Sequence, residues 1–210
     1  MAWTFGEAAL PETEEYAAVV RDLSSLVLQL EHPERRLAEL IAALEAARSD
    51  LASLVPPDHR PRVGAAIDAD GRVYLDHSRD VGAYNPAVPT YAICVDGDAA
   101  AGTVTFPVLY EGPPGVVHGG FLAVFFDAVI QHHSCDVGVA GKTTRLELRY
   151  HAPTPLLTEL RFAISRTVDA HRIESTAELF AGDLLCCSAT MRAVAGDRAA
   201  LPTVSPRKAP

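Results

Sequence analysis

The sequence predicts an α+β fold in which an antiparallel sheet wraps around one long helix, with a two-helix extension before it. Three observations lead to this prediction. Apolar residues recur at helical spacing near the N-terminus, a long and mainly apolar segment occupies 119–133, and four runs with strand-like alternation follow that segment. One helix followed by consecutive antiparallel strands is the order expected when a sheet encloses a single helix.

The extension consists of two segments with helical periodicity. The first covers about 12–31, and the second begins at Pro33, which suits the first position of a helix. Pro56-Pro57 ends the second helix, and 58–63 is a linker. Because two helices cannot bury their apolar stripes alone, they must pack on the rest of the chain or on a second subunit, as a clamp or as a lid over a pocket. The stripes contain Tyr16, Val19, Val20, Leu23, Leu26, Val27 and Leu30, and then Leu37, Leu40, Ile41, Leu44 and Leu51.

The pattern changes to strand-like alternation after the linker. Asp96-Gly97 and Gly182-Asp183 supply turns between strands. We expect three regions: an extension with its linker (1–62), a sheet-and-helix domain (63–195) and a disordered tail (196–210). The predicted strands are short ones at 72–77, 91–96 and 102–109 and longer ones near 143–151, 157–168, 171–181 and 184–194.

Composition and charge exclude several classes of function. The net charge of −9 repels phosphate backbones, so nucleic acid is not an expected partner. No run of eighteen apolar residues occurs, so no membrane span is expected. The N-terminus lacks a secretory signal, which predicts a cytoplasmic protein. Reduced, core-filling thiols are then expected at Cys94, Cys135, Cys186 and Cys187.

The central helix carries one charge. Residues 121–130 are apolar apart from Asp127, and a helix that is apolar on every side should be buried on all sides. Burial of an unpaired carboxylate costs several kcal/mol, so Asp127 needs a partner or a chemical task. Two interpretations remain open: a core aspartate satisfied by backbone donors or a hydroxyl, and a functional carboxylate.

His118-Gly119-Gly120 begins this helix. Glycine lets a ligand approach the backbone closely, and the free N–H groups of a first helical turn can stabilise a developing oxyanion. Gly119 and Asp127 are eight residues apart, which corresponds to about 12 Å along one helix. Both must lie within about 3–4 Å of one reacting carbonyl. One helix cannot supply both groups, so the catalytic interpretation predicts a homodimer with two shared sites.

Two segments carry a family resemblance. Residues 112–120 are Gly-Pro-Pro-Gly-Val-Val-His-Gly-Gly, with Asp127 nine residues after the histidine, and 142–150 are Lys-Thr-Thr-Arg-Leu-Glu-Leu-Arg-Tyr, followed by Pro153 and Pro155. Here the sequence resembles the PaaI-like acyl-CoA thioesterases of the hotdog superfamily. The resemblance covers about 85–194 and leaves the helical extension outside it.

The resemblance implies a hotdog fold, a dimer or dimer of dimers, and hydrolysis of acyl-CoA thioesters without a cofactor. It makes Asp127 the nucleophile or the general base and the Gly119 N–H the oxyanion donor. His118 orders the carbonyl end of the site, and Thr143 corresponds to a residue that positions water. Thr144 is the adjacent alternative for that role. We expect Thr144 to bind the substrate together with Gly120 and His132. Many relatives carry asparagine six residues before the histidine, where Gly112 stands here.

Other residues suggest additional contacts with substrate. His132 lies one and a half turns beyond Asp127 and is expected to line the acyl pocket. The segment 131–136 resembles a metal cluster but lacks a second ligand pair, so no metal is expected. The aromatic residues of the helix either contact an apolar acyl group or belong to the core. The basic residues of the strands either contact the phosphates of CoA or face solvent. These residues are Phe121, Phe125 and Phe126, and Lys142, Arg145, Arg149 and Arg161.

Two other functions compete with hydrolysis. A non-catalytic acyl-CoA sensor or carrier would use the same pocket, and the glycine at position 112 favours it. A hotdog hydratase or dehydratase would need an aspartate and a histidine that handle water together, with His132 or His133 beside Asp127.

Overall fold

The computed structural model describes side chains over 12–55, 80–135 and 142–195, and the backbone alone for strands and helix ends outside those ranges. The ordered elements are β1 (Ala2–Glu7), α1 (Pro11–Leu28), α2 (Arg35–Leu54), β2 (Arg62–Val63), β3 (Gly71–Leu75), α3 (Val81–Tyr84), β4 (Tyr91–Asp96), β5 (Ala99–Thr105), η1 (Val108–Tyr110), α4 (Gly119–Ser134), β6 (Val139–Tyr150), β7 (Glu159–Asp169), β8 (Arg172–Ala181), β9 (Leu184–Gly196) and β10 (Ser205–Pro206).

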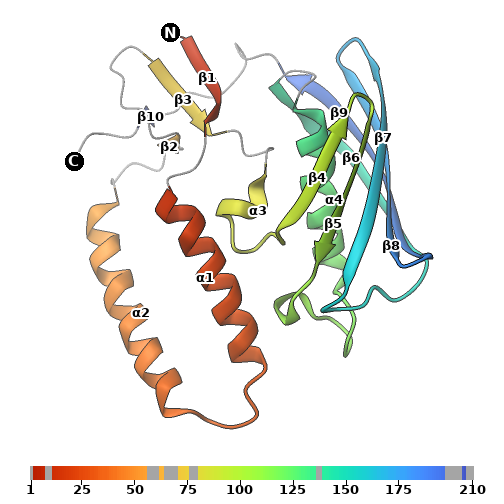
Figure 1. Ribbon diagram of the computed structural model, residues 1–210. Coiled ribbons are helices and arrows are strands. Elements are labelled where there is room, and N and C mark those ends of the chain that lie inside the picture. The colour runs from red at the N-terminus through yellow and green to blue at the C-terminus, as the bar shows by residue number, and fades with distance from the viewer. Residues whose placement is uncertain are drawn as a thin grey trace.

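A six-stranded antiparallel sheet curves around α4, which confirms the predicted fold class (Figure 1). The strand order is β4-β5-β7-β8-β9-β6, so β4 and β6 form the two edges. Along β7, Leu160, Phe162 and Ile164 are buried while the residues between them are exposed, as the alternation predicts. The turns at Gly97 and Gly182 use positive φ angles of 56° and 58°, which glycine adopts without strain.

One side of α4 forms the core with the sheet. Phe125, Phe126 and Ile130 are fully buried there, and the Phe125 ring makes an edge contact with Phe162 at 5.4 Å between centroids. The other side of the helix is open, since Val124 is 40% exposed and Asp127 is partly exposed. The prediction of a helix buried on all sides is therefore wrong for the single chain, because the sheet covers only one side.

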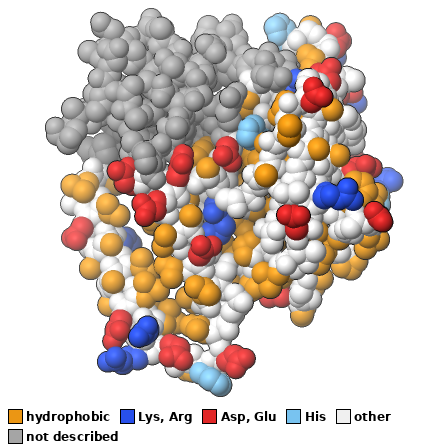
Figure 2. Space-filling model, viewed as in Figure 1, with side chains coloured by type: hydrophobic (Ala, Val, Ile, Leu, Met, Phe, Trp, Pro, Cys, Tyr) orange, Lys and Arg blue, Asp and Glu red, His pale blue; other side chains and the backbone are white. Residues whose placement is uncertain are grey.

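The extension packs on the rest of the chain through α1. Ala17 and Arg21 are buried there, and Arg21 Nη2 donates to the carbonyls of Gly82 (2.6 Å) and Asn85 (3.2 Å). No residue of α2 is buried, and apolar side chains gather on the surface of both helices (Figure 2). Pro33 does not start the second helix: Glu34 is the N-cap and α2 begins at Arg35. The stripe expected to be buried includes exposed residues at Tyr16, Val19, Leu26, Val27, Leu30, Ile41, Leu44 and Leu51.

Short parallel pairings link distant parts of the chain. β1 pairs with β3, across the predicted boundary at residue 62, and β10 pairs with β2. The rest of the predicted tail lies outside the described residues, and the division into three regions stays a prediction. Within the described part of the chain, no helix combines the length and apolarity needed to cross a membrane.

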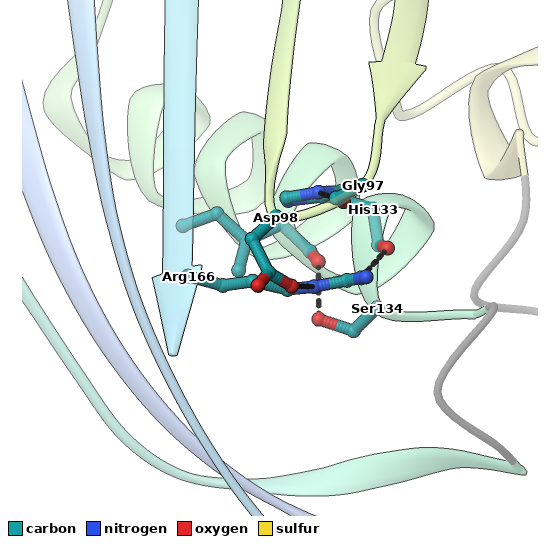
Figure 3. Close-up of polar contacts among 6 residues, drawn as sticks. Gly97, Asp98, His133, Ser134 and Arg166 are labelled. Atoms are coloured by element: carbon teal, nitrogen blue, oxygen red, sulfur yellow. Dashed lines mark hydrogen bonds and ion pairs between the residues drawn. The ribbon is translucent and has the colours of Figure 1, made fainter. Parts of the chain in front are cut away.

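A buried arginine connects the end of α4 to the β4–β5 turn (Figure 3). Arg166 projects inward from β7 with its side chain 4% exposed, and its Nη1 donates to the carbonyl of His133 in the last turn of α4. Its Nε lies 3.2 Å from Asp98 Oδ1. A cation at a helix C-terminus is favoured by the helix dipole and satisfies a terminal carbonyl.

Arg166→Met is expected to destabilise the protein by about 3 kcal/mol, because the buried His133 carbonyl loses its charged donor. This corresponds to a fall in Tm of roughly 8 °C in thermal denaturation. Arg161→Met is the matched control, since Arg161 projects from the outer face of the same strand and is mostly exposed. Equal Tm values for the two variants would contradict this account.

Candidate active site

The start of α4 is arranged by its capping histidine. His118 is the N-cap, and its Nδ1 accepts a hydrogen bond of 3.0 Å from the Gly120 N–H. The neutral ring therefore carries its proton on Nε2. Among the described residues no acceptor is found for the N–H of Gly119, the first residue of the helix. This unpaired donor is the kind of group that can bind an oxyanion.

Gly112 explains how His118 is held in place. A Cβ atom at Gly112 would lie 2.8 Å from His118 Cα and 2.9 Å from its Cβ, distances too short for any side chain. The Gly112 N–H donates to the Val116 carbonyl at 2.9 Å, which keeps the turn tight. An asparagine at this position is therefore incompatible with the observed placement of His118. The close packing of His118 thus requires glycine at position 112.

Gly112→Ala should displace His118 and break its bond to the Gly120 N–H. We expect a loss of stability of about 2 kcal/mol, as for other overpacked sites, and a weaker helix start. Thermal denaturation measures the first effect, and the NMR shifts of the His118 ring measure the second. An alanine variant with wild-type Tm and unchanged His118 resonances would show that the close packing has no such role.

A cleft of about 570 Å³ adjoins the helix start. Its wall includes Gly119, Gly120 and Leu122 from α4 and Tyr150 from the end of β6. The Tyr150 hydroxyl donates to the Gly119 carbonyl at 3.1 Å, and a Cβ at Gly119 would come within 3.0 Å of that hydroxyl. Glycine at 119 thus permits both the close tyrosine contact and open access to the N–H. The cleft can admit a small acyl or thioester group beside this N–H.

Asp127 lies on the open side of α4 and is hydrogen-bonded to β6. The Thr143 hydroxyl donates to Asp127 Oδ1 at 2.9 Å. Thr144, the adjacent alternative, instead donates to the Arg192 carbonyl of β9 at 3.0 Å. The structure thus brings Thr143 and Asp127 together and directs Thr144 elsewhere. It also shows that Asp127 is partly exposed in the single chain rather than buried.

Gln131 joins this pair and was missed in the sequence. Its Nε2 lies 2.6 Å from Thr143 Oγ1, so that Gln131, Thr143 and Asp127 form a continuous chain of hydrogen bonds. A signal was present, because Gln131 follows Asp127 by four residues and so shares its face of the helix.

Both histidines near the end of α4 contact the region around β4. His132 Nδ1 accepts from the Asp80 N–H at 3.3 Å and lies 3.0 Å from the Tyr91 hydroxyl. Burial, followed by the Asp80 carboxylate, raises the pKa of Tyr91 well above its ordinary value, so the tyrosine stays a neutral donor. His133 is buried, and its Nε2 contacts the Gly97 carbonyl at 3.0 Å. These contacts differ from the aspartate–histidine pair that a hydratase would need.

The described residues of the segment 131–136 add no support for a metal cluster. Among the described residues, no three His, Cys, Asp or Glu side chains come together as a metal site requires, and Asp136 lies outside them. None of the four cysteines, all of which the structure describes, is in a disulfide. Burial, followed by the neighbouring Cys186, raises the pKa of Cys187 to about 11, which keeps it protonated at neutral pH.

The basic strand residues project from the outer face of the sheet. Arg145 pairs with Glu147 at 2.6 Å, and Arg161 donates to the Gly182 carbonyl at 2.7 Å. Arg149 occupies the same alternating face of β6 as Arg145, and Lys142 is exposed near the start of the strand. The sheet separates this face from α4. The fully buried Phe125 and Phe126 belong to the core, and Phe121 packs on Tyr110 at 5.0 Å.

Comparison with known proteins identifies the fold. No family model and no curated protein matches the chain. A crystal structure of a thioesterase superfamily protein, 24% identical, superposes with a TM-score of 0.69 and covers 90% of this chain and 94% of that chain. The chain therefore has the hotdog fold, as that thioesterase superfamily protein does. The sheet-and-helix domain alone makes up less than 90% of this chain. The match to that protein therefore includes residues of the helical extension as well.

Two other solved structures match about half of this chain at lower similarity. A phenylacetic acid degradation-related protein from Ralstonia eutropha JMP134 is 21% identical over 50% of this chain and 83% of that chain, with a TM-score of 0.46. A hypothetical thioesterase with coenzyme A from Streptococcus pneumoniae TIGR4 is 18% identical over 52% and 91% of the two chains, with a TM-score of 0.48.

Proposed function

We propose that this protein hydrolyses acyl-CoA thioesters to a free carboxylic acid and CoA. The observation that carries the proposal is the layout of α4. An unpaired N–H of Gly119 lies beside an apolar-walled cleft, and a hydrogen-bonded carboxylate, Asp127, stands eight residues later on the open side of the same helix. The hotdog fold, found in proteins named as thioesterases, supports the same function.

In the proposed reaction, the Gly119 N–H stabilises the oxyanion that forms at the thioester carbonyl. Asp127 either attacks the carbonyl carbon or removes a proton from the attacking water. If Asp127 attacks, the carbon–sulfur bond breaks as an anhydride forms between Asp127 and the acyl group, and water then hydrolyses this anhydride to the free acid and the Asp127 carboxylate. If water attacks instead, its oxygen bonds to the acyl carbon as the carbon–sulfur bond breaks. On both routes one proton of the water goes to the sulfur, which leaves as the CoA thiol. Thr143 orients the Asp127 carboxylate, and His118 fixes the backbone at the oxyanion end.

We infer that each site is shared between two subunits. Along one helix Gly119 and Asp127 are about 12 Å apart, too far to act on one carbonyl. The open side of α4 lies next to β6, an edge strand whose outward backbone groups can pair with another strand. A twofold dimer through β6 would bring two α4 helices side by side and pair Gly119 of one chain with Asp127 of the other.

The proposed hydrolysis is tested with a panel of acyl-CoAs and a thiol reagent. Release of CoA thiol that depends on enzyme and acyl-CoA supports the proposal. Cys94 is exposed and will react with the reagent, so a Cys94→Ser protein supplies the background-free measurement.

The alternative of an acyl-CoA sensor is favoured by the absence of a polar side chain at Gly112. Tight binding of acyl-CoA without thiol release across the panel would establish the sensor and refute the hydrolase.

A further inference from the structure

Gln131 links the candidate carboxylate to the interior of the protein. The residue is 7% exposed and lies one turn beyond Asp127 on α4. Its Nε2 lies 2.6 Å from Thr143 Oγ1 and 3.9 Å from Met191 Sδ. Thr143 Oγ1 lies in turn 2.9 Å from Asp127 Oδ1. Three side chains from α4 and β6 thus form a line of two short hydrogen bonds.

The direction of each hydrogen bond follows from the chemistry of the groups. An ionised carboxylate only accepts, so the single hydroxyl proton of Thr143 goes to Asp127. The hydroxyl oxygen then accepts from its other neighbour, and only the NH₂ end of Gln131 can donate. With Nε2 facing Thr143, the hydroxyl proton cannot turn toward Gln131. The amide therefore commits Thr143 to Asp127.

The other end of the Gln131 amide makes its presence costly. Its Oε1 is buried and has no hydrogen-bond partner among the described residues. A buried acceptor without a donor is destabilising, whereas an apolar side chain of similar size at such a position is neutral or stabilising. An apolar side chain would fill the same space but could not donate to the Thr143 hydroxyl.

We propose that Gln131 is a positioning residue of the Asp127 site, one that holds the Thr143 hydroxyl on Asp127 Oδ1 and so directs the second carboxylate oxygen toward the substrate or the water. The role rests on the proposed thioester hydrolysis. Gln131 touches neither substrate nor reacting atoms and acts only through Thr143.

Gln131→Met provides the first test, because methionine has a similar length and no N–H donor. Positioning predicts that kcat falls about ten-fold with KM unchanged, while Tm is unchanged or higher. A purely structural role, in which the amide ties α4 to β6, predicts that Tm falls and that kcat falls only with it. Wild-type kcat, or a fall of kcat that follows a loss of Tm, overturns the proposal.

The second test measures whether Gln131 acts through Thr143. In a Thr143→Val background, which has no hydroxyl to orient, Gln131→Met should cause no further loss of kcat. In the matched Thr143→Ser background, which keeps the hydroxyl, the ten-fold loss should remain. Equal losses in the two backgrounds overturn the proposal.

The hydrogen-bond chain also has a readout that needs no turnover. The side-chain amide resonances of Gln131 in a ¹H–¹⁵N NMR spectrum should shift strongly with Thr143→Val and little with Thr143→Ser. Resonances that ignore Thr143→Val overturn the chain itself. A wild-type protein that cleaves no acyl-CoA overturns the proposed hydrolysis instead, and the amide response then still decides whether Gln131 orients Thr143.

Discussion

Asp127→Asn is expected to lower turnover of acyl-CoA by about 10³-fold, within the range known for loss of a general base or nucleophile. The amide has nearly the same shape and can still accept from the Thr143 hydroxyl through its oxygen, so the local geometry is retained. It can neither attack the thioester nor take a proton from water. The fold should survive, because the removed charge lies on the open side of α4 and not in the core. Steady-state thiol release gives kcat, and thermal denaturation gives Tm.

The matched control for this variant is Glu147→Gln. Glu147 is an exposed acid on the outer face of the sheet, paired with Arg145, and it should be replaceable without loss of kcat. If Asp127→Asn retained near-wild-type turnover at unchanged Tm, Asp127 would not be the catalytic carboxylate.

The second large effect is recovery of activity when two inactive variants are mixed. Gly119→Pro removes the oxyanion N–H, and proline is well accepted at the first position of a helix. Asp127→Asn removes the carboxylate. If each site takes Gly119 from one subunit and Asp127 from the other, a mixed dimer has one site with both lesions and one intact site. With random pairing, half of the dimers are mixed, so about a quarter of wild-type activity should return.

Two controls make the mixing experiment decisive. Gly119→Ala adds the same Cβ contact with the Tyr150 hydroxyl, 3.0 Å away, but keeps the N–H, so it separates crowding from loss of the donor. Light scattering and a mass-tagged subunit verify that mixed dimers form. Recovery that stays at zero in verified mixed dimers would place both groups of a site within one chain. A fully active monomer would lead to the same conclusion.

Much of the fold could be predicted from the sequence because periodicity reflects one-sided burial. The run at 91–96 coincides with β4, and the apolar segment at 119–133 coincides with α4 to within one residue. His118 was recognised at the helix start, and its role as N-cap confirms that boundary. Local patterns are reliable here because each element meets the same sheet-and-helix core along its length.

Tertiary contacts could not be predicted in the same way. The apolar stripe of α1 suggested the buried face, yet α1 docks through Ala17 and the buried Arg21, whose partners include a carbonyl of a short helix 61 residues away. The four-residue α3 is too short to produce a periodic signal. An apolar α4 also looked fully buried, although one side is open in the single chain. Apolarity marks a surface that needs a partner and does not say which chain supplies it.

The candidate residues of the site could be named from the sequence, but the contacts between them could not. The spacing of Gly119 and Asp127 could be read from the sequence. The sequence left Thr143 and Thr144 as alternatives, and the geometry of β6 shows that Thr143 is the one that contacts Asp127. The placement of His132 against Tyr91 depends on β4, which is distant in the sequence. Gln131 shares the helix face of Asp127, but its role depends on a contact with Thr143 of β6 that the helix spacing alone does not reveal.

A crystal structure of Asp127→Asn with an intact acyl-CoA would show how the two subunits share the site. We expect a thioester carbonyl oxygen about 3 Å from the Gly119 N–H of one subunit, with the carboxamide at position 127 of the other subunit facing the carbonyl carbon. The acyl group should enter the cleft beside Leu122 and Tyr150. A thioester held by Gly119 and residue 127 of the same chain, or bound away from both, would contradict the shared catalytic site.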